Sequence, residues 1–73
     1  MQKKVRMTEE VRELLRYKFL FNLSIPLIAR QLKVSESTAM RWFLRRTSPS
    51  PLCLEKIRQF NRVIHEIAEA KHG

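Results

Sequence analysis

The sequence has few of the residues that punctuate or cross-link a chain: one glycine, three prolines and one cysteine among 73 residues. The scarcity of glycine and proline disfavours an all-β fold, which needs these residues in its hairpin turns. The single cysteine, Cys53, excludes an internal disulfide and a cysteine-based zinc cluster. No apolar run approaches the roughly 20 residues of a membrane-spanning helix. We therefore expect an all-α protein of the cytoplasm, with no membrane segment.

Acidic residues are also scarce, and charge is unevenly distributed along the chain. Fifteen Lys and Arg against seven Asp and Glu give a formal net charge of +8. Residues 1–46 hold eleven of these bases and four acids, a net charge of +7, whereas residues 47–73 hold four bases and three acids, a net charge of +1. A field of this sign attracts polyanions, so nucleic acid or an anionic membrane surface is the first partner to consider. The membrane is the weaker choice, because the longest apolar helix falls in the least basic part.

Capping residues and apolar spacing predict four helices in one domain spanning residues 1–73. Thr8, Ser24, Ser35 and Ser50 are suited to accept a hydrogen bond from the first turn of a helix. The spacing that follows them predicts helices at residues 9–21, 25–32, 36–44 and 51–71. Residues 1–7 carry three bases and scattered apolar side chains, which indicates a flexible basic arm. The expected buried stripe of the first helix is Val11, Leu14, Leu15 and Phe19.

The second and third predicted helices are separated by a tight joint. Ala29 is small enough to let two helices cross closely. The apolar positions around this crossing are Ile28, Leu32, Val34, Ala39 and Trp42. With these residues, the segment 24–46 resembles the helix-turn-helix of the phage-repressor-like regulators, the Cro and Xre group. Lys33 stands where that family usually has glycine, and a left-handed backbone is expected there. The segment also resembles the homeodomain-like modules of transposases and recombinases.

The resemblance implies that the third helix lies in the major groove, with the side chains of its first turns on base edges. Carried onto this sequence, it assigns base reading to Glu36, Ser37, Met40 and Arg41. Arg41 would bind guanine, Glu36 would accept from cytosine, Ser37 suits several bases, and Met40 suits a thymine methyl. Other interpretations stay open: Glu36 complements the helix dipole, Ser37 is a solvated surface residue, or Arg41 forms an ion pair within the protein. The expected phosphate contacts are Ser24, Arg30, Lys33, Ser35, Thr38, Arg45, Arg46, Thr47 and Ser48.

The long last helix has more apolar surface than a helix-turn-helix needs. Cys53, Ile57, Phe60, Ile64 and Ile67 are spaced like a coiled-coil seam. Either the first helix of the same chain or a second copy covers Phe60, Ile64 and Ile67, and we favour the second copy. A two-fold homodimer would place its recognition helices about 34 Å apart and make the DNA site palindromic.

The sequence as a whole favours a double-stranded DNA-binding transcriptional regulator, a homodimeric repressor associated with the nucleoid of a bacterial host. No glycine-rich phosphate loop is present and Cys53 has no evident base beside it, so we expect no enzymatic activity. We also expect no metal, no cofactor and no small-molecule effector. Two alternatives remain: an accessory DNA-binding subunit of recombination, transposition or packaging, and a helical protein–protein adaptor whose basicity is incidental.

Overall fold

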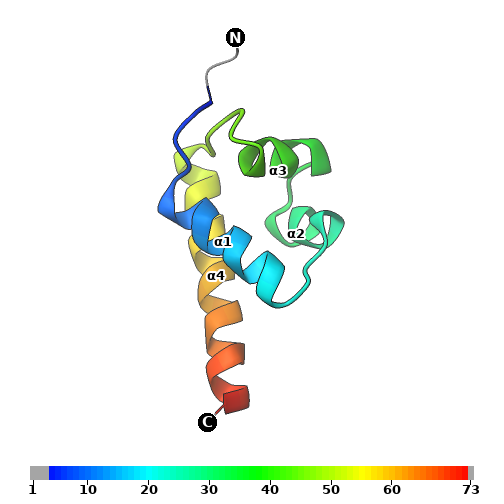
Figure 1. Cartoon of the computed structure of the whole chain (residues 1–73), viewed down its shortest axis with the longest axis vertical. Helices are drawn as coiled ribbons and strands as arrows, with labels where there is room; N and C mark the ends of the chain where they lie inside the picture. The colour runs from blue at the N-terminus through cyan, green and yellow to red at the C-terminus, as the bar shows by residue number, and fades with distance from the viewer. Residues whose placement is uncertain (1–3, 73) are drawn as a thin grey trace.

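Four helices and no strand make up the part of the chain that the computed structural model describes, which is the backbone of residues 4–72 and the side chains of residues 4–70. The helices are α1 (Glu9–Leu20), α2 (Ile25–Leu32), α3 (Glu36–Phe43) and α4 (Pro51–His72). Figure 1 shows α4 along the long axis of the molecule, with α1 packed against it and α2 and α3 to one side. The all-α, four-helix fold expected from the sequence is therefore confirmed. None of the described helices combines the length and the apolar content needed to cross a membrane.

The helices begin where the capping residues predict. Each of the four capping hydroxyls accepts a hydrogen bond from the backbone amide three residues later, at 3.1 to 3.3 Å. The bond satisfies one of the first-turn amides that have no partner inside the helix. The four residues are Thr8, Ser24, Ser35 and Ser50.

Three of the helices end at a residue with a left-handed backbone, and none of these residues is glycine. Asn22, Lys33 and Arg45 have φ values of 54°, 58° and 60°. After each of them, the next amide donates to the carbonyl five residues earlier, at 2.9 to 3.0 Å. These turns end α1 and α3 one residue before the predicted boundaries, whereas α4 continues one residue beyond its predicted end. A left-handed residue with a Cβ costs roughly 1 kcal/mol, less for asparagine.

The core combines side chains from all four helices. Val11 and Leu14 of α1 pack with buried residues of the other three helices, which are Ile28, Ala29, Leu32, Ala39, Trp42 and Ile57. Met7, Leu23 and Val34 are partly buried against this cluster. The apolar residues expected around the crossing of the second and third helices are thus all in the core or against it.

Phe19 does not belong to the core, so its predicted place on the buried stripe of α1 is wrong. Its side chain is 74% exposed, and the ammonium of Lys18 lies 5.3 Å from the centroid of its ring. The reason is geometric: five residues separate Phe19 from the fully buried Leu14, which turns its side chain by about 140° around the helix. Leu15, whose position around the helix lies between those of Leu14 and Phe19, is only half-buried.

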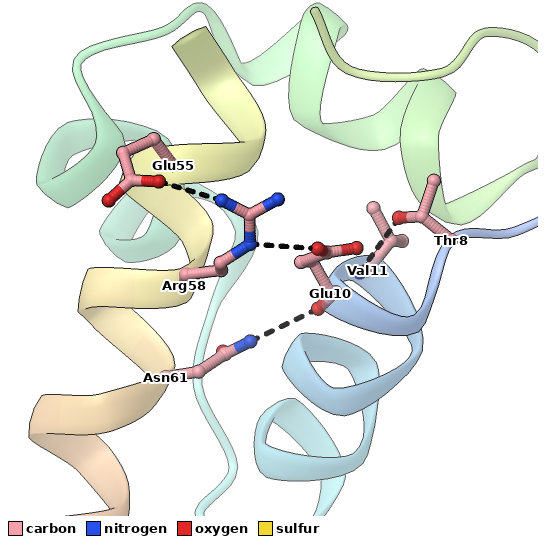
Figure 2. A network of polar contacts seen from close by, with 6 residues as sticks. All are labelled: Thr8, Glu10, Val11, Glu55, Arg58 and Asn61. Carbon is pink, nitrogen blue, oxygen red and sulfur yellow. Dashed lines mark hydrogen bonds and ion pairs between the residues drawn. The ribbon is translucent and has the colours of Figure 1, made fainter. Parts of the chain in front are cut away.

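A polar network fixes α1 against α4 (Figure 2). Arg58 lies between two carboxylates, at 2.9 Å from Glu10 and 2.7 Å from Glu55. Asn61, which is buried, donates from Nδ2 to the Glu10 carbonyl at 3.1 Å. The backbone amide of Glu10 and the Arg58 guanidinium, both donating to its carboxylate, hold the pKa of Glu10 below its ordinary value. Glu10 therefore stays ionised and paired at neutral pH, and the register between the two helices is fixed by directional bonds.

The contacts of Val5 and of Phe60 differ from the sequence-based prediction. The first three residues of the predicted flexible arm lie outside the described residues, but Val5 is tied to Arg45 by two hydrogen bonds. In α4, Phe60 packs against the core of its own chain, which is the intramolecular alternative for this residue. Further along, Val63 and Ile67 are 51% and 50% exposed. The C-terminal end of α4 extends beyond α1 and α2 (Figure 1).

Candidate nucleic-acid interface

The third helix, α3, has one buried face and one exposed face. Ala39 and Trp42 are buried in the core and hold the helix against the rest of the protein. Glu36, Ser37, Met40 and Arg41 are all exposed. At about 100° per residue, these four side chains fall within about 140° of the helix circumference. The structure therefore brings together, on one solvent-facing surface, all four residues that the sequence assigned to base reading.

The joint between α2 and α3 sets the orientation of this surface. The Lys33 amide donates to the Arg30 carbonyl at 3.2 Å, and the Val34 amide donates to the Ala29 carbonyl at 3.0 Å. Lys33 has the left-handed backbone expected from its position in the motif, with φ 58° and ψ 45°. Ala29 is buried at the crossing, where a larger side chain would push the helices apart. The chain therefore turns within three residues, and α3 begins at a fixed angle to α2.

The exposed polar residues of α3 have no side-chain partners among the residues that the structure describes. Arg41 makes no ion pair or side-chain hydrogen bond there, so the alternative of an internal ion pair is not realised in the described part of the chain. Glu36 and Ser37 likewise have none. Glu36 is the first residue of α3, so it also complements the helix dipole, as the alternative interpretation holds. These side chains are available to a ligand.

The candidate phosphate contacts surround α3, and several already have structural roles. Ser24 and Ser35 cap α2 and α3, and the Ser35 hydroxyl donates to Thr38 Oγ1 at 2.8 Å. Thr38 is partly buried. Five further candidates are exposed residues on α2, in the turn, and in the loop between α3 and α4: Arg30, Lys33, Arg46, Thr47 and Ser48.

Among the candidates, Arg45 has a side chain that contacts a distant segment of the chain. Its Nε donates to the Val5 carbonyl at 3.0 Å, and its own carbonyl accepts from the Val5 amide at 2.9 Å. The two residues are 40 positions apart in the sequence. No local pattern of residues signals such a contact, so it could not be predicted from the sequence.

Leu44 is a candidate that reasoning from the sequence missed. It follows α3 immediately, lies four residues after Met40 and seven after Ser37, and is 50% exposed. This spacing continues the outward face of the helix by one turn. Leu44 and Met40 together give that face an apolar strip, which suits contact with thymine methyl groups. The spacing of residues 37, 40 and 44 was present in the sequence and could have identified Leu44.

Charge is separated along the long axis of the molecule. Arg41, Arg45 and Arg46 follow one another along α3 and its following loop, at the end of the molecule from which the N-terminal segment emerges (Figure 1). Residues 61–72, towards the opposite end, contain two bases, Arg62 and Lys71, and two acids, Glu66 and Glu69. An anionic polymer is therefore attracted to the end that carries α3.

Comparisons with known proteins do not assign a family. The chain matches no protein-family model, no curated protein sequence and no solved structure.

The left-handed turn at Lys33 predicts a stabilising substitution. Lys33→Gly removes the Cβ that crowds this backbone conformation, so the free energy of unfolding should rise by roughly 1 kcal/mol. For a domain of this size, that corresponds to an increase in Tm of about 4–8 °C. Thermal unfolding followed by circular dichroism measures it. Lys33→Ala is the control, because it removes the charge and keeps the Cβ; an equal rise in both variants would show that strain at this turn is not the cause.

Proposed function

We propose that this protein binds double-stranded DNA by placing α3 in the major groove, and that it acts as a transcriptional regulator. The observation that carries the proposal is the exposed face of α3. Four side chains able to contact base edges point outward together, and the polar ones have no partner among the described residues. A helix buried on one side and unpartnered on the other fits the major groove, which is wide enough to admit it.

The chemistry of this face supports sequence-specific reading. The Arg41 guanidinium can donate two hydrogen bonds to guanine O6 and N7, and the Glu36 carboxylate can accept from a cytosine amino group. Ser37 can bond to several bases, and Met40 offers apolar contact. Binding at such a site excludes other proteins from the same stretch of DNA, so we propose repression as the sign of regulation. An accessory role in recombination, transposition or packaging would use the same face.

The surrounding charges support phosphate binding on either side of the groove. Arg30 and Lys33 are exposed at the end of α2, and Arg46, Thr47 and Ser48 are exposed after α3. Contacts of this kind fix the orientation of the protein on the duplex and supply most of the affinity for any sequence. The proposed interface thus combines a small surface that contacts bases with surrounding residues that contact phosphates.

We further propose that the protein acts as a homodimer through the C-terminal half of α4. Val63 and Ile67 are four residues apart on one face of this helix and half-exposed, with Ile64 half-buried beside them. A helix end that extends beyond the body of the protein gains little from its own chain, and pairing with a second copy would stabilise it. Two recognition helices would then read a palindromic site.

The adaptor function is the second candidate, and one observation favours it. Phe19 and Leu20 at the end of α1 are 74% and 63% exposed. Large apolar side chains exposed next to each other are a common feature of protein-binding surfaces. The adaptor function requires no affinity for DNA, so a duplex-binding measurement separates the two candidates.

Arg41→Ala tests the base-reading role of α3. Preferred duplexes are first selected from a random pool with the wild-type protein, and affinities for the selected and random duplexes are measured by fluorescence anisotropy. Loss of a bidentate contact should lower affinity for the selected duplex about 10- to 100-fold, with a much smaller loss on random duplex.

Arg62→Ala on α4 is the matched control, since it removes the same charge far from α3 and should leave both affinities unchanged. Equal losses on selected and random duplex in Arg41→Ala would show a phosphate contact instead of base reading. If the wild-type protein binds no duplex even at low salt, the DNA-binding function is wrong and the adaptor function is favoured.

Ile67→Glu tests the homodimer. A carboxylate in the centre of the proposed contact should convert a dimer at tens of micromolar into a monomer, as measured by sedimentation equilibrium. Arg62→Glu introduces the same charge about 140° away around the helix and should leave the dimer intact. A wild-type protein that is monomeric at these concentrations, or an equal effect of both substitutions, would contradict the proposed dimer.

A further inference from the structure

The segment of residues 4–7 is held in place by the end of α3, although the sequence suggests a flexible arm. Val5 donates from its amide to the Arg45 carbonyl at 2.9 Å and accepts from Arg45 Nε at 3.0 Å. Met7, two residues later, is packed against the hydrophobic core. The segment is thus attached at Val5 and again, two residues later, at Met7, before α1 begins.

Burial alternates along this segment. Val5 and Met7 are half-buried, whereas Lys4 and Arg6 are exposed. An extended backbone sends successive side chains to opposite sides, so attachment through Val5 and Met7 directs Lys4 and Arg6 away from the protein. Residues 4–7 therefore form an attached strip, with the cations Lys4 and Arg6 on its outer side.

This strip lies at the same end of the molecule as α3. Figure 1 shows the N-terminal segment beside the loop between α3 and α4, at the end opposite to the C-terminus. Arg45, the residue that holds it, is the second residue after α3. A polyanion bound along α3 would therefore pass close to Lys4 and Arg6.

We propose that Lys4 and Arg6 form a second phosphate-binding site for the duplex, and that Arg45 is the positioning residue that holds this site beside α3. This inference rests on the proposed DNA-binding function and revises one part of it. Arg45, expected to contact phosphate itself, instead acts through the segment that it binds. A pre-attached segment loses less conformational entropy on binding than a flexible arm, so its two cations contribute more affinity.

The left-handed backbone of Arg45 is consistent with this role. A φ of 60° is unfavourable for arginine, yet it ends α3 and turns the Arg45 carbonyl and side chain toward the same residue, Val5. Glycine would adopt this backbone more easily, but it has no side chain to bind the Val5 carbonyl.

The salt dependence of duplex binding tests the site, because each phosphate contact adds about 0.9 to the slope of log K against log salt. The full chain is titrated with a fluorescent duplex at several salt concentrations. Lys4→Gln/Arg6→Gln should lower the magnitude of the slope by about 1.8. Arg62→Gln/Lys71→Gln, which removes two charges from the distal half of α4, is the matched control and should leave it unchanged. An unchanged slope in Lys4→Gln/Arg6→Gln overturns the second site.

The role of Arg45 is tested by Arg45→Met in two backgrounds. In the wild-type background this substitution should release the segment and remove most of the same 1.8 of slope, about twice the loss of a single direct contact. In the Lys4→Gln/Arg6→Gln background it should change the slope no further. A further loss of about 0.9 in that background would show that Arg45 itself contacts phosphate and would overturn its positioning role.

A readout without DNA completes the test. At a temperature well below the Tm of both proteins, trypsin should cleave after Arg6 faster in Arg45→Met than in the wild-type protein, and equal cleavage rates would contradict the attachment. If the wild-type protein binds no duplex, the second site fails together with the proposed function. If it binds duplex and only the Lys4→Gln/Arg6→Gln slope is unchanged, this inference alone fails.

Discussion

The close crossing of α2 and α3 is the constraint on which the candidate interface depends. The left-handed backbone at Lys33 turns the chain between the two helices, and Ala29 lets them approach. Once this angle is fixed, burial of Ala39 and Trp42 leaves only one orientation for α3 about its axis. The exposed positions of Glu36, Ser37, Met40 and Arg41 follow from that orientation. In this way a small domain can present a candidate binding surface on one helix without a binding cavity.

The rest of the molecule supports this unit by different means. The core joins all four helices through apolar side chains, whereas α1 is set against α4 by directional bonds from Arg58 and Asn61. Such bonds add directional contacts to the apolar packing between the two helices. The N-terminal segment is then held to the end of α3 through Arg45. Positive charge is concentrated in the part of the chain that contains α3, since residues 1–46 have a net charge of +7 and residues 47–73 a net charge of +1.

The parts of the fold that were predictable from the sequence are those controlled by local chemistry. The four helix starts depend on a hydroxyl and an amide three residues apart, so Thr8 and the three serines identified them. The outward face of α3 follows from helical period once Ala39 and Trp42 are taken as core. The ends of α1 and α3 were each misplaced by one residue, because any residue that tolerates a left-handed backbone can end a helix.

Contacts between distant segments were not predictable in this way. The exposure of Phe19 depends on how far α1 packs along its neighbours, and the packing of Phe60 in its own core depends on where α4 crosses them. The bonds between Val5 and Arg45 join segments 40 residues apart, and neither residue type predicts which residue it will contact. Because of these bonds, the N-terminal segment is attached to the rest of the protein and is not the flexible arm that its composition predicts.

The most direct test of DNA binding through α3 is a titration of the isotopically labelled protein with a selected DNA duplex, followed by amide chemical shifts. If α3 lies in the major groove, the largest shifts should occur in residues 35–46, and residues 61–70 should be nearly unaffected. Large shifts confined to the end of α1 and to α4, with α3 unchanged, would contradict binding through α3.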